Sequence, residues 1–388
     1  MKNIASKNDL ALFGAAPAFD APVHVGRPNI GSQTQFNHLV DEMFERKWLG
    51  NNGPLLLEFE RRVAEFLGVK HCVAMCNGTI ALEIAIRALG LKGEVIIPSY
   101  TFVATAHALS WQGITPVFAD INAHDHCLDV SSVARMITPN TTGIIGVHLW
   151  GNGADVEALG QLAQKHQLTL MFDAAHAFGC SHLGQRIGGF GKAEVFSFHA
   201  TKFFNTFEGG AVTTNDDLLA EKMRLMRNFG FHGFDNVIHP GTNGKMIEIC
   251  AAMGIVNLDY LPQVVAANRH NYQQYTEAFA GLDGVSLLQF RDAENCNYQY
   301  VVLELAEHRQ GQRDQIVAAL HAENILARKY FWPGCHAMPY YKALFPHASL
   351  VLPNTVRVAD RVIVLPTGTT LPKDTPNVVA RVISALWQ

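Results

Sequence analysis

The stretch FSFHATKFFNTFEGGAVTTND, residues 196–216, decides how the rest of the chain is interpreted. Its start completes a short apolar run that predicts a strand over 194–198, with the hydroxyl of Ser197 near its end and Lys202 five residues beyond that serine. A glutamate and two glycines then predict a turn into a second strand over 211–214. A lysine placed like Lys202 is either a solvated surface charge or, where it is partly desolvated, an amine that can condense with an aldehyde.

Short apolar runs alternate with helical patterns through the first two-thirds of the chain. The expected strands are 71–75, 94–98, 116–119, 143–148, 168–172, 194–198 and 211–214, and the expected helices are 79–89, 101–112, 130–137 and 155–166. This alternation predicts an α/β fold with a mostly parallel seven-stranded sheet that is covered on both faces. In such sheets functional groups gather at the carboxyl ends of the strands.

The pattern changes after a long helical stretch over 245–280, in which Pro262 is expected to break or kink the helix. The expected elements that follow are strands at 298–305 and 362–365 and helices at 311–322 and 375–386. We therefore expect a large domain with an N-terminal arm, residues 1–265, and a smaller C-terminal α+β domain, residues 266–388.

Composition excludes several classes of partner. The 388 residues are 48% hydrophobic and 16% charged, and the formal net charge is −4 without any basic block, which argues against nucleic acid as the main partner. The N-terminus lacks a signal-peptide pattern and no run of 18 uncharged apolar residues occurs, so a cytoplasmic protein without a membrane span is expected. Seven scattered cysteines without a C-x-x-C pair predict reduced thiols and no metal site.

Two groups of residues after predicted strands could hold a flat, phosphorylated ligand. In CNGTIALEIA, Gly78 and Thr79 begin a helix whose free N–H groups and hydroxyl could bind a phosphate, although an ordinary helix cap explains the same pattern. In PSYTFVATAHA, the ring of Tyr100 or Phe102 could stack on a ligand or simply pack in the core.

A third group follows the strand in LTLMFDAAHAFG, which ends in Asp173, with His176 three residues later. A carboxylate at the end of an apolar strand needs a charged or hydrogen-bonding partner, such as a protonated ring nitrogen. Capping of the next helix by Asp173 is the ordinary alternative. Taken with Lys202, these groups match what pyridoxal 5′-phosphate (PLP) requires: a phosphate site, a stacking ring, a carboxylate for the pyridine nitrogen and a lysine for the aldehyde.

The ordered set of motifs resembles fold-type I PLP enzymes and, among them, the DegT-type nucleotide-sugar aminotransferases. The matching stretches are NNGPLLLEFE, NGTIALEIA, PSYTFVATAHA, DAAHAFG, SFHATKFFNTFEGGAVTTND and NGKMIEICAAMG. The resemblance covers nearly the whole chain, and its S-F-H-x-x-K…E-G-G block is highly specific. It implies a PLP-dependent aminotransferase of deoxyaminosugar biosynthesis, as in lipopolysaccharide O-antigen.

The resemblance also implies a role for each site residue. Lys202 would hold PLP as an aldimine and then move the proton between the substrate carbon and the cofactor. The other implied contacts with the cofactor are made by Asp173 to the ring nitrogen, His176 to the ring hydroxyl, Phe102 to the ring face, and Gly78, Thr79 and Ser197 to the phosphate. Asn243 would reach the phosphate of the partner subunit's cofactor, which implies a homodimer with shared sites. Some relatives carry histidine in place of Lys202 and act as dehydratases.

The substrate follows from the same resemblance. The stretch RKYFWPGCHAMPYY, residues 328–341, is similar to enzymes that aminate C4 of a dTDP-4-keto-6-deoxyhexose, with His336 as the candidate substrate contact and glutamate as the expected amino donor. Amination at a 3-keto position, or of a UDP- or GDP-sugar, stays open. Outside this class, a non-catalytic PLP-binding regulator is a further alternative, but no DNA-binding module is evident in the sequence. A Rossmann dehydrogenase is a poor alternative because this sequence has no G-x-G-x-x-G after a strand near its start, and a cofactor-free Schiff-base lyase would leave Asp173 unexplained.

Overall fold

The computed structural model describes residues 2–388 and contains the predicted seven-stranded sheet. Its strand order is β2-β10-β9-β6-β5-β3-β4. The strands are β2 (His71–Met75), β3 (Glu94–Pro98), β4 (Thr115–Ala119), β5 (Thr141–Val147), β6 (Thr169–Asp173), β9 (Glu194–Ser197) and β10 (Gly210–Thr214). All neighbouring pairs are parallel except those of β10, which runs antiparallel to β2 and β9. The prediction of a mostly parallel sheet is therefore confirmed.

Helices cover both faces of this sheet because alternate strand residues point in opposite directions. They are α2 (Pro54–Leu67), α3 (Gly78–Ala88), α4 (Ala104–Ser110), α5 (Val130–Met136), α6 (Val156–Lys165), α7 (Asp217–Met226) and α8 (Glu248–Ala278). Val73 and Met75 of β2 pack in one cluster with α3, α4 and α7. Cys72 and Ala74 face the opposite way and pack with α2 and α8.

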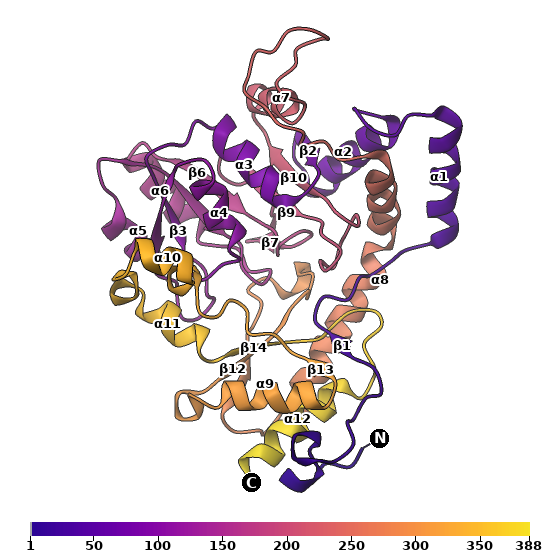
Figure 1. The fold of residues 1–388 in the computed structure, drawn as a ribbon, viewed down its shortest axis with the longest axis vertical. Helices are drawn as coiled ribbons and strands as arrows, with labels where there is room; N and C mark the ends of the chain where they lie inside the picture. Colours follow the sequence, from indigo (N-terminus) through magenta and orange to yellow (C-terminus); the bar gives the residue numbers. More distant parts are fainter. Residues whose placement is uncertain (1) are drawn as a thin grey trace.

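The C-terminal third forms a smaller α+β unit, which lies at the lower end of the view in Figure 1. This unit contains a three-stranded antiparallel sheet of β11 (Val285–Leu287), β12 (Val301–Leu305) and β14 (Val362–Leu365). It also contains the helices α9 (Arg313–Ala322) and α12 (Thr375–Trp387). The N-terminal arm also lies here, since β1 (Val23–His24) pairs with β13 (Ile325–Leu326). The domain boundary at residue 265 falls inside α8 and stays a prediction, and these contacts favour grouping the arm with the C-terminal unit.

The remaining elements are short or lie at the edge of the molecule. They are α1 (Gln33–Arg46), α10 (Pro339–Leu344), α11 (Pro353–Ala359), the hairpin of β7 (Ser181–His182) and β8 (Gln185–Arg186), and the 3-10 turns η1 (Lys7–Asp9), η2 (Ala11–Phe13), η3 (Ala293–Asn295), η4 (Glu307–Arg309), η5 (Cys335–Ala337) and η6 (Ala348–Val351). Pro262 lies within α8 without ending it. By length and composition α8 is the one described helix that could cross a membrane, but half of its apolar window is buried in the fold, as in a core helix.

A buried ion pair joins α2 to the sheet and supplies a stability prediction. Arg227 pairs with Glu60 and also donates to the carbonyl of Ala74 at 2.6 Å, while Glu60 accepts from the Ala74 N–H at 2.8 Å. Removing one partner leaves an uncompensated buried charge. We expect Arg227→Met to lower the free energy of unfolding by about 3–5 kcal/mol in urea titrations. The double variant with Glu60→Gln should lose less, and equal losses would contradict this account.

Candidate active site

The carboxyl ends of two neighbouring parallel strands bring candidate residues together. Asp173 ends β6 and pairs with Val195 of β9, two residues before Ser197. On the other side of β9, Gly210 of β10 faces Ser197 and also faces Met75 at the end of β2. The loops after β2, β6 and β9 therefore leave the sheet at one edge, where the sequence pattern predicted a site.

The amino end of α3 forms a tight cradle beside β9. Asn77 caps this helix by accepting a hydrogen bond from the Ile80 N–H at 2.8 Å, so the ordinary cap interpretation is correct for Asn77. A Cβ atom at Gly78 would lie 3.0 Å from Cβ of Ser197, and one at Gly210 would lie 2.5 Å from the Gly78 nitrogen. Only glycine fits at position 210, where the close contact is with the backbone, whereas a side chain at position 78 would crowd Ser197. No side-chain hydrogen bond within residues 2–388 uses the hydroxyls of Thr79 or Ser197, which leaves them available to an anion at the helix end.

Asp173 is buried and held by two donors. Its carboxylate accepts from the Thr105 hydroxyl at 2.8 Å and from the Ala175 N–H at 3.1 Å. Burial raises the pKa of Asp173, and these hydrogen bonds and the charge of Lys202 oppose that rise. A nearby cation therefore favours the ionised carboxylate. Sequence inspection missed Thr105, because only the fold brings a residue of α4 to the end of β6.

Lys202 lies in a tight turn after β9 and is half-buried. Its backbone N–H donates to the carbonyl of His199 at 2.8 Å. Desolvation by burial lowers the pKa of the Lys202 amine to about 8, although the negative charge of Asp173 acts in the opposite direction. An amine with this pKa is partly unprotonated near neutral pH, which suits a nucleophile and not a solvated surface charge.

Phe102 presents an exposed ring at the start of α4. It is 57% exposed, and its closest ring neighbour is Phe331 of the C-terminal unit, with centroids 6.4 Å apart. The core-packing alternative therefore fails for Phe102 but holds for Tyr100, which is fully buried and donates to the carbonyl of Tyr330 at 2.6 Å. An exposed aromatic face beside buried polar groups is suited to stacking on a planar ligand.

His176 is enclosed by aromatic residues that no local sequence pattern predicts at this place. Its ring stacks with Trp150 and Phe331, each with centroids 5.6 Å away, and contacts Tyr300 at 4.5 Å. Burial, followed by the charge of Lys202, lowers the pKa of His176 well below its usual value. The imidazole is therefore neutral at physiological pH.

The two remaining candidates lie apart from these groups. Asn243 is exposed and forms a bridge with Asn228. His336 is buried, and its Nδ1 atom lies 2.7 Å from the hydroxyl of Ser99. Among the residues described, no hydrogen bond, ion pair or ring contact joins either side chain to Lys202 or Asp173, so their roles toward a partner's cofactor and a substrate stay predictions.

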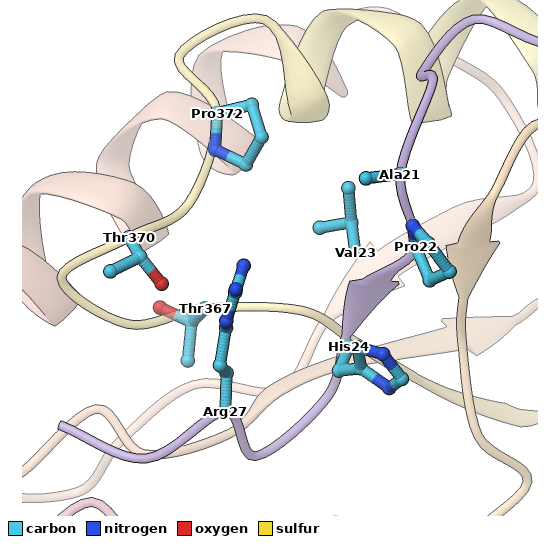
Figure 2. Close-up of a pocket in the computed structure, with 8 residues that line it drawn as sticks. All are labelled: Ala21, Pro22, Val23, His24, Arg27, Thr367, Thr370 and Pro372. Atoms are coloured by element: carbon cyan, nitrogen blue, oxygen red, sulfur yellow. The ribbon is translucent and has the colours of Figure 1, made fainter.

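Two surface pockets lie away from the candidate site residues. One of about 90 Å³ separates the N-terminal arm from the loop after β14, and the side chain of Arg27 points into it beside Thr367 and Thr370 (Figure 2). A groove of about 480 Å³ lies between α8, Arg186 and Cys296. Neither is lined by any of the nine predicted site residues.

The residues at the sheet edge fit PLP. The buried carboxylate of Asp173 has no ion-pair partner at hydrogen-bonding distance among residues 2–388, which suits a protonated ring nitrogen, and the lowered pKa of the Lys202 amine suits an aldehyde. Gly78, Thr79 and Ser197 lie together at the amino end of α3, where free N–H groups and two hydroxyls are donors suited to a phosphate. A metal centre has no such support, because no group of three or more His, Cys, Asp or Glu side chains that could hold an ion occurs within residues 2–388.

Known proteins with similar sequences and structures agree with this interpretation. A dTDP-4-amino-4,6-dideoxy-D-glucose transaminase of Shigella dysenteriae is 35% identical over 356 residues, which is 92% of this chain and 96% of the relative. A GDP-perosamine synthase of Caulobacter vibrioides is 36% identical and covers 79% of this chain and 83% of its own length. The crystal structure of DesI, determined in the presence of its TDP-sugar product, matches with a TM-score of 0.92 and 47% identity over 97% of this chain and 95% of that chain.

The family model described as DegT/DnrJ/EryC1/StrS aminotransferase family matches residues 31–386. The predictions of a fold-type I architecture, of PLP as the cofactor and of aminotransferase activity are thereby confirmed. The chain belongs to the DegT/DnrJ/EryC1/StrS aminotransferase family.

Proposed function

We propose that this aminotransferase moves an amino group from glutamate to C4 of dTDP-4-keto-6-deoxyglucose. The observation that carries the proposal is the placement of buried Asp173 at the end of β6, next to β9 and the turn after it that holds half-buried Lys202, in a chain of this family. The relative from Shigella dysenteriae, named for the dTDP-linked 4-amino sugar, and DesI with its TDP-sugar product support this substrate.

PLP supplies an aldehyde for the amino group and a cationic ring that withdraws electrons from the substrate carbon. Lys202 contributes the ε-amine that would bind the cofactor and that, once displaced by substrate, would move a proton through Nζ between the substrate carbon and the cofactor. Because burial lowers the pKa of this amine, the neutral form that accepts the proton is accessible near neutral pH.

The neighbouring residues bind and orient. Asp173, fixed by Thr105, holds the proton on the ring nitrogen through its negative charge. Thr79 and Ser197 bind the phosphate with the amino end of α3, and Phe102 keeps water from one face of the ring. His176 contacts the ring hydroxyl as a neutral donor.

A GDP-linked 4-keto sugar is the second candidate, because a relative with 36% identity is named GDP-perosamine synthase. The purified protein, loaded with PLP, should be incubated with glutamate and a panel of dTDP-, UDP- and GDP-linked 3-keto and 4-keto sugars. NMR of each product locates the new amine. An amine at C3, or turnover with the GDP-sugar alone, would refute the preferred substrate, and no turnover with any sugar would favour the non-catalytic regulator.

The pKa of Lys202 predicts how apoprotein takes up PLP. Since the value is lowered to about 8, about one-tenth of the amine is unprotonated at pH 7 and about nine-tenths at pH 9. The rate of appearance of the visible band after mixing with PLP should therefore rise about tenfold per pH unit below 8 and level off above it. Stopped-flow absorbance measures this rate, and a profile that keeps rising beyond pH 10 would contradict the lowered pKa.

The segment after α7 favours a homodimer. Residues 229–243 project from the body of the molecule at the top of Figure 1 and carry the exposed side chains of Phe229, Phe234, Val237 and Ile238. Phe234 is 97% exposed, an arrangement that is costly in water but stabilising when a second copy covers it. Asn243 ends this segment, in keeping with a role at the partner's phosphate site. Sedimentation equilibrium tests the dimer, and Phe234→Ser should weaken it.

Cytoplasmic localisation and use of the product in lipopolysaccharide O-antigen are further parts of this proposal. The soluble substrates, glutamate and a nucleotide-linked sugar, support the first. Relatives named for amino-sugar and polysaccharide synthesis support the second. Cell fractionation and the composition of surface polysaccharide in a deletion strain test them.

A further inference from the structure

The start of α4 and the loop before it carry two buried threonines that lead to Asp173. Thr101 is 2% exposed and Thr105 is fully buried. Their hydroxyl oxygens lie 3.0 Å apart, and the Thr105 hydroxyl lies 2.8 Å from Oδ2 of Asp173. The Thr101 hydroxyl makes no other hydrogen bond in the described part of the chain. A second hydroxyl therefore lies behind the one that contacts the carboxylate.

The chemistry of these three groups determines the direction of their hydrogen bonds. An ionised carboxylate can only accept, so the Thr105 hydroxyl donates its single proton to Asp173. The Thr105 oxygen can then only accept from its other neighbour, which makes Thr101 the donor of the second hydrogen bond. In buried surroundings, each hydrogen bond of such a chain polarises the next one and strengthens it.

The C-terminal unit holds the outer end of this chain of hydrogen bonds. Cys335 of η5 donates its backbone N–H to the carbonyl of Ser99 at 2.8 Å, and its thiol donates to the carbonyl of Thr101 at 3.4 Å. Cys335 and Ser99 are fully buried. The loop after β3 is therefore attached to the C-terminal unit on both sides of position 100, which keeps the Thr101 hydroxyl beside Thr105.

We propose that Thr101 is a positioning residue that directs the Thr105 hydroxyl proton to Asp173 and thereby stabilises the ionised carboxylate at the end of β6. This inference deepens the proposed function, in which that carboxylate holds the proton on the ring nitrogen, and its effect on catalysis rests on that function. A hydrogen bond to the ionised form lowers the pKa of a carboxyl, so loss of the Thr101 hydroxyl should raise the pKa of Asp173. Lys202 is the charged side chain that acts on this carboxyl, and it is present in every variant below.

The first measurement uses the apoprotein and needs no cofactor. NMR of protein labelled with carbon-13 in its aspartate carboxyl groups follows the titration of Asp173, whose signal is identified by its loss in Asp173→Asn. Thr101→Val should raise the midpoint by about 0.2–0.6 unit, and Thr105→Val, which removes the direct hydrogen bond, should raise it by about one to two units. In a Thr105→Val background, Thr101→Val should cause no further shift.

Further variants separate the hydroxyl from the rest of the side chain. Thr101→Ser keeps the hydroxyl and should keep the wild-type midpoint, whereas Thr101→Ala should shift it as Thr101→Val does. Thr213→Val removes another buried threonine hydroxyl, which donates to the carbonyl of Gly188 at 2.6 Å, and should leave the midpoint unchanged. In the PLP-loaded protein with glutamate and the keto sugar, Thr101→Val should lower kcat about twofold to threefold, with KM little changed.

The outcomes distinguish this inference from the proposed function. An unchanged midpoint in Thr101→Val and Thr101→Ala, or an equal shift in the Thr105→Val background, refutes the positioning role and leaves the proposed function standing. A shifted midpoint with an unchanged kcat refutes the catalytic part of the inference. If the midpoint shifts as expected but the wild type does not transaminate, the proposed function fails and the action of Thr101 on Asp173 stands.

Discussion

Lys202→Ala is expected to abolish transamination, with kcat falling by about 10⁴-fold, the upper range for loss of a proton-transferring group. In the proposed mechanism, the variant loses both the amine that would bind the cofactor and the group that would move the proton at the substrate carbon. No other lysine can replace it, because the coupling to Asp173 and the lowered pKa both depend on its place in the turn after β9. The fold should persist, since Lys202 is half-buried and its side chain makes no hydrogen bond within residues 2–388.

Two measurements check this expectation. Steady-state kinetics with glutamate and the keto sugar give kcat, and hydride reduction of the PLP-loaded protein followed by mass spectrometry locates the pyridoxyl group. Lys192→Ala is the matched control, because this exposed lysine lies ten residues earlier in the chain, and it should retain full activity. A pyridoxyl group on any residue other than Lys202 would refute the assignment even if the variant were inactive.

The central sheet could be predicted from sequence because its strands are buried on both faces. Such strands are short, continuous apolar runs, and the bounds expected for β2, β3 and β14 are the observed ones. Helices α1, α2 and α7 were missed. The apolar pattern of α1 is weak, because this helix buries only Met43. The stretch of α2 carries a clear apolar face, which includes Leu56, Phe59 and Val63, and this pattern was overlooked.

Part of the site could be predicted for the same physical reason. Asp173, Ser197 and Lys202 follow strand ends, so one edge of the sheet collects them. The aromatic wall of Trp150, Tyr300 and Phe331 could not be found this way, because it joins segments that are far apart in the chain. The local sequence around these residues contains no sign of that contact.

Asp173→Asn is expected to lower kcat by about 10²–10³-fold while PLP still binds at Lys202. Asparagine can occupy the same space, with its oxygen accepting from the Ala175 N–H and its amide nitrogen donating to the Thr105 oxygen, so the geometry of the buried site changes little. What disappears is the negative charge that holds a proton on the ring nitrogen. Without it the ring withdraws electrons from the substrate carbon less well, and proton removal by Lys202 becomes the slow step.

Further variants show whether Asp173 acts through its negative charge or through its position in the site. Thr105→Val removes one hydrogen bond to Asp173 but leaves the charge, so kcat should fall only about tenfold or less. Asp155→Asn is the control, because it replaces an exposed helix cap with another good cap and should leave kcat unchanged. A deuterium isotope effect from α-deuterated glutamate should grow in Asp173→Asn if proton removal has become slower. If instead kcat stays within about threefold of the wild type, Asp173 does not act through its charge, since even one hydrogen bond to a charged group is worth more than that.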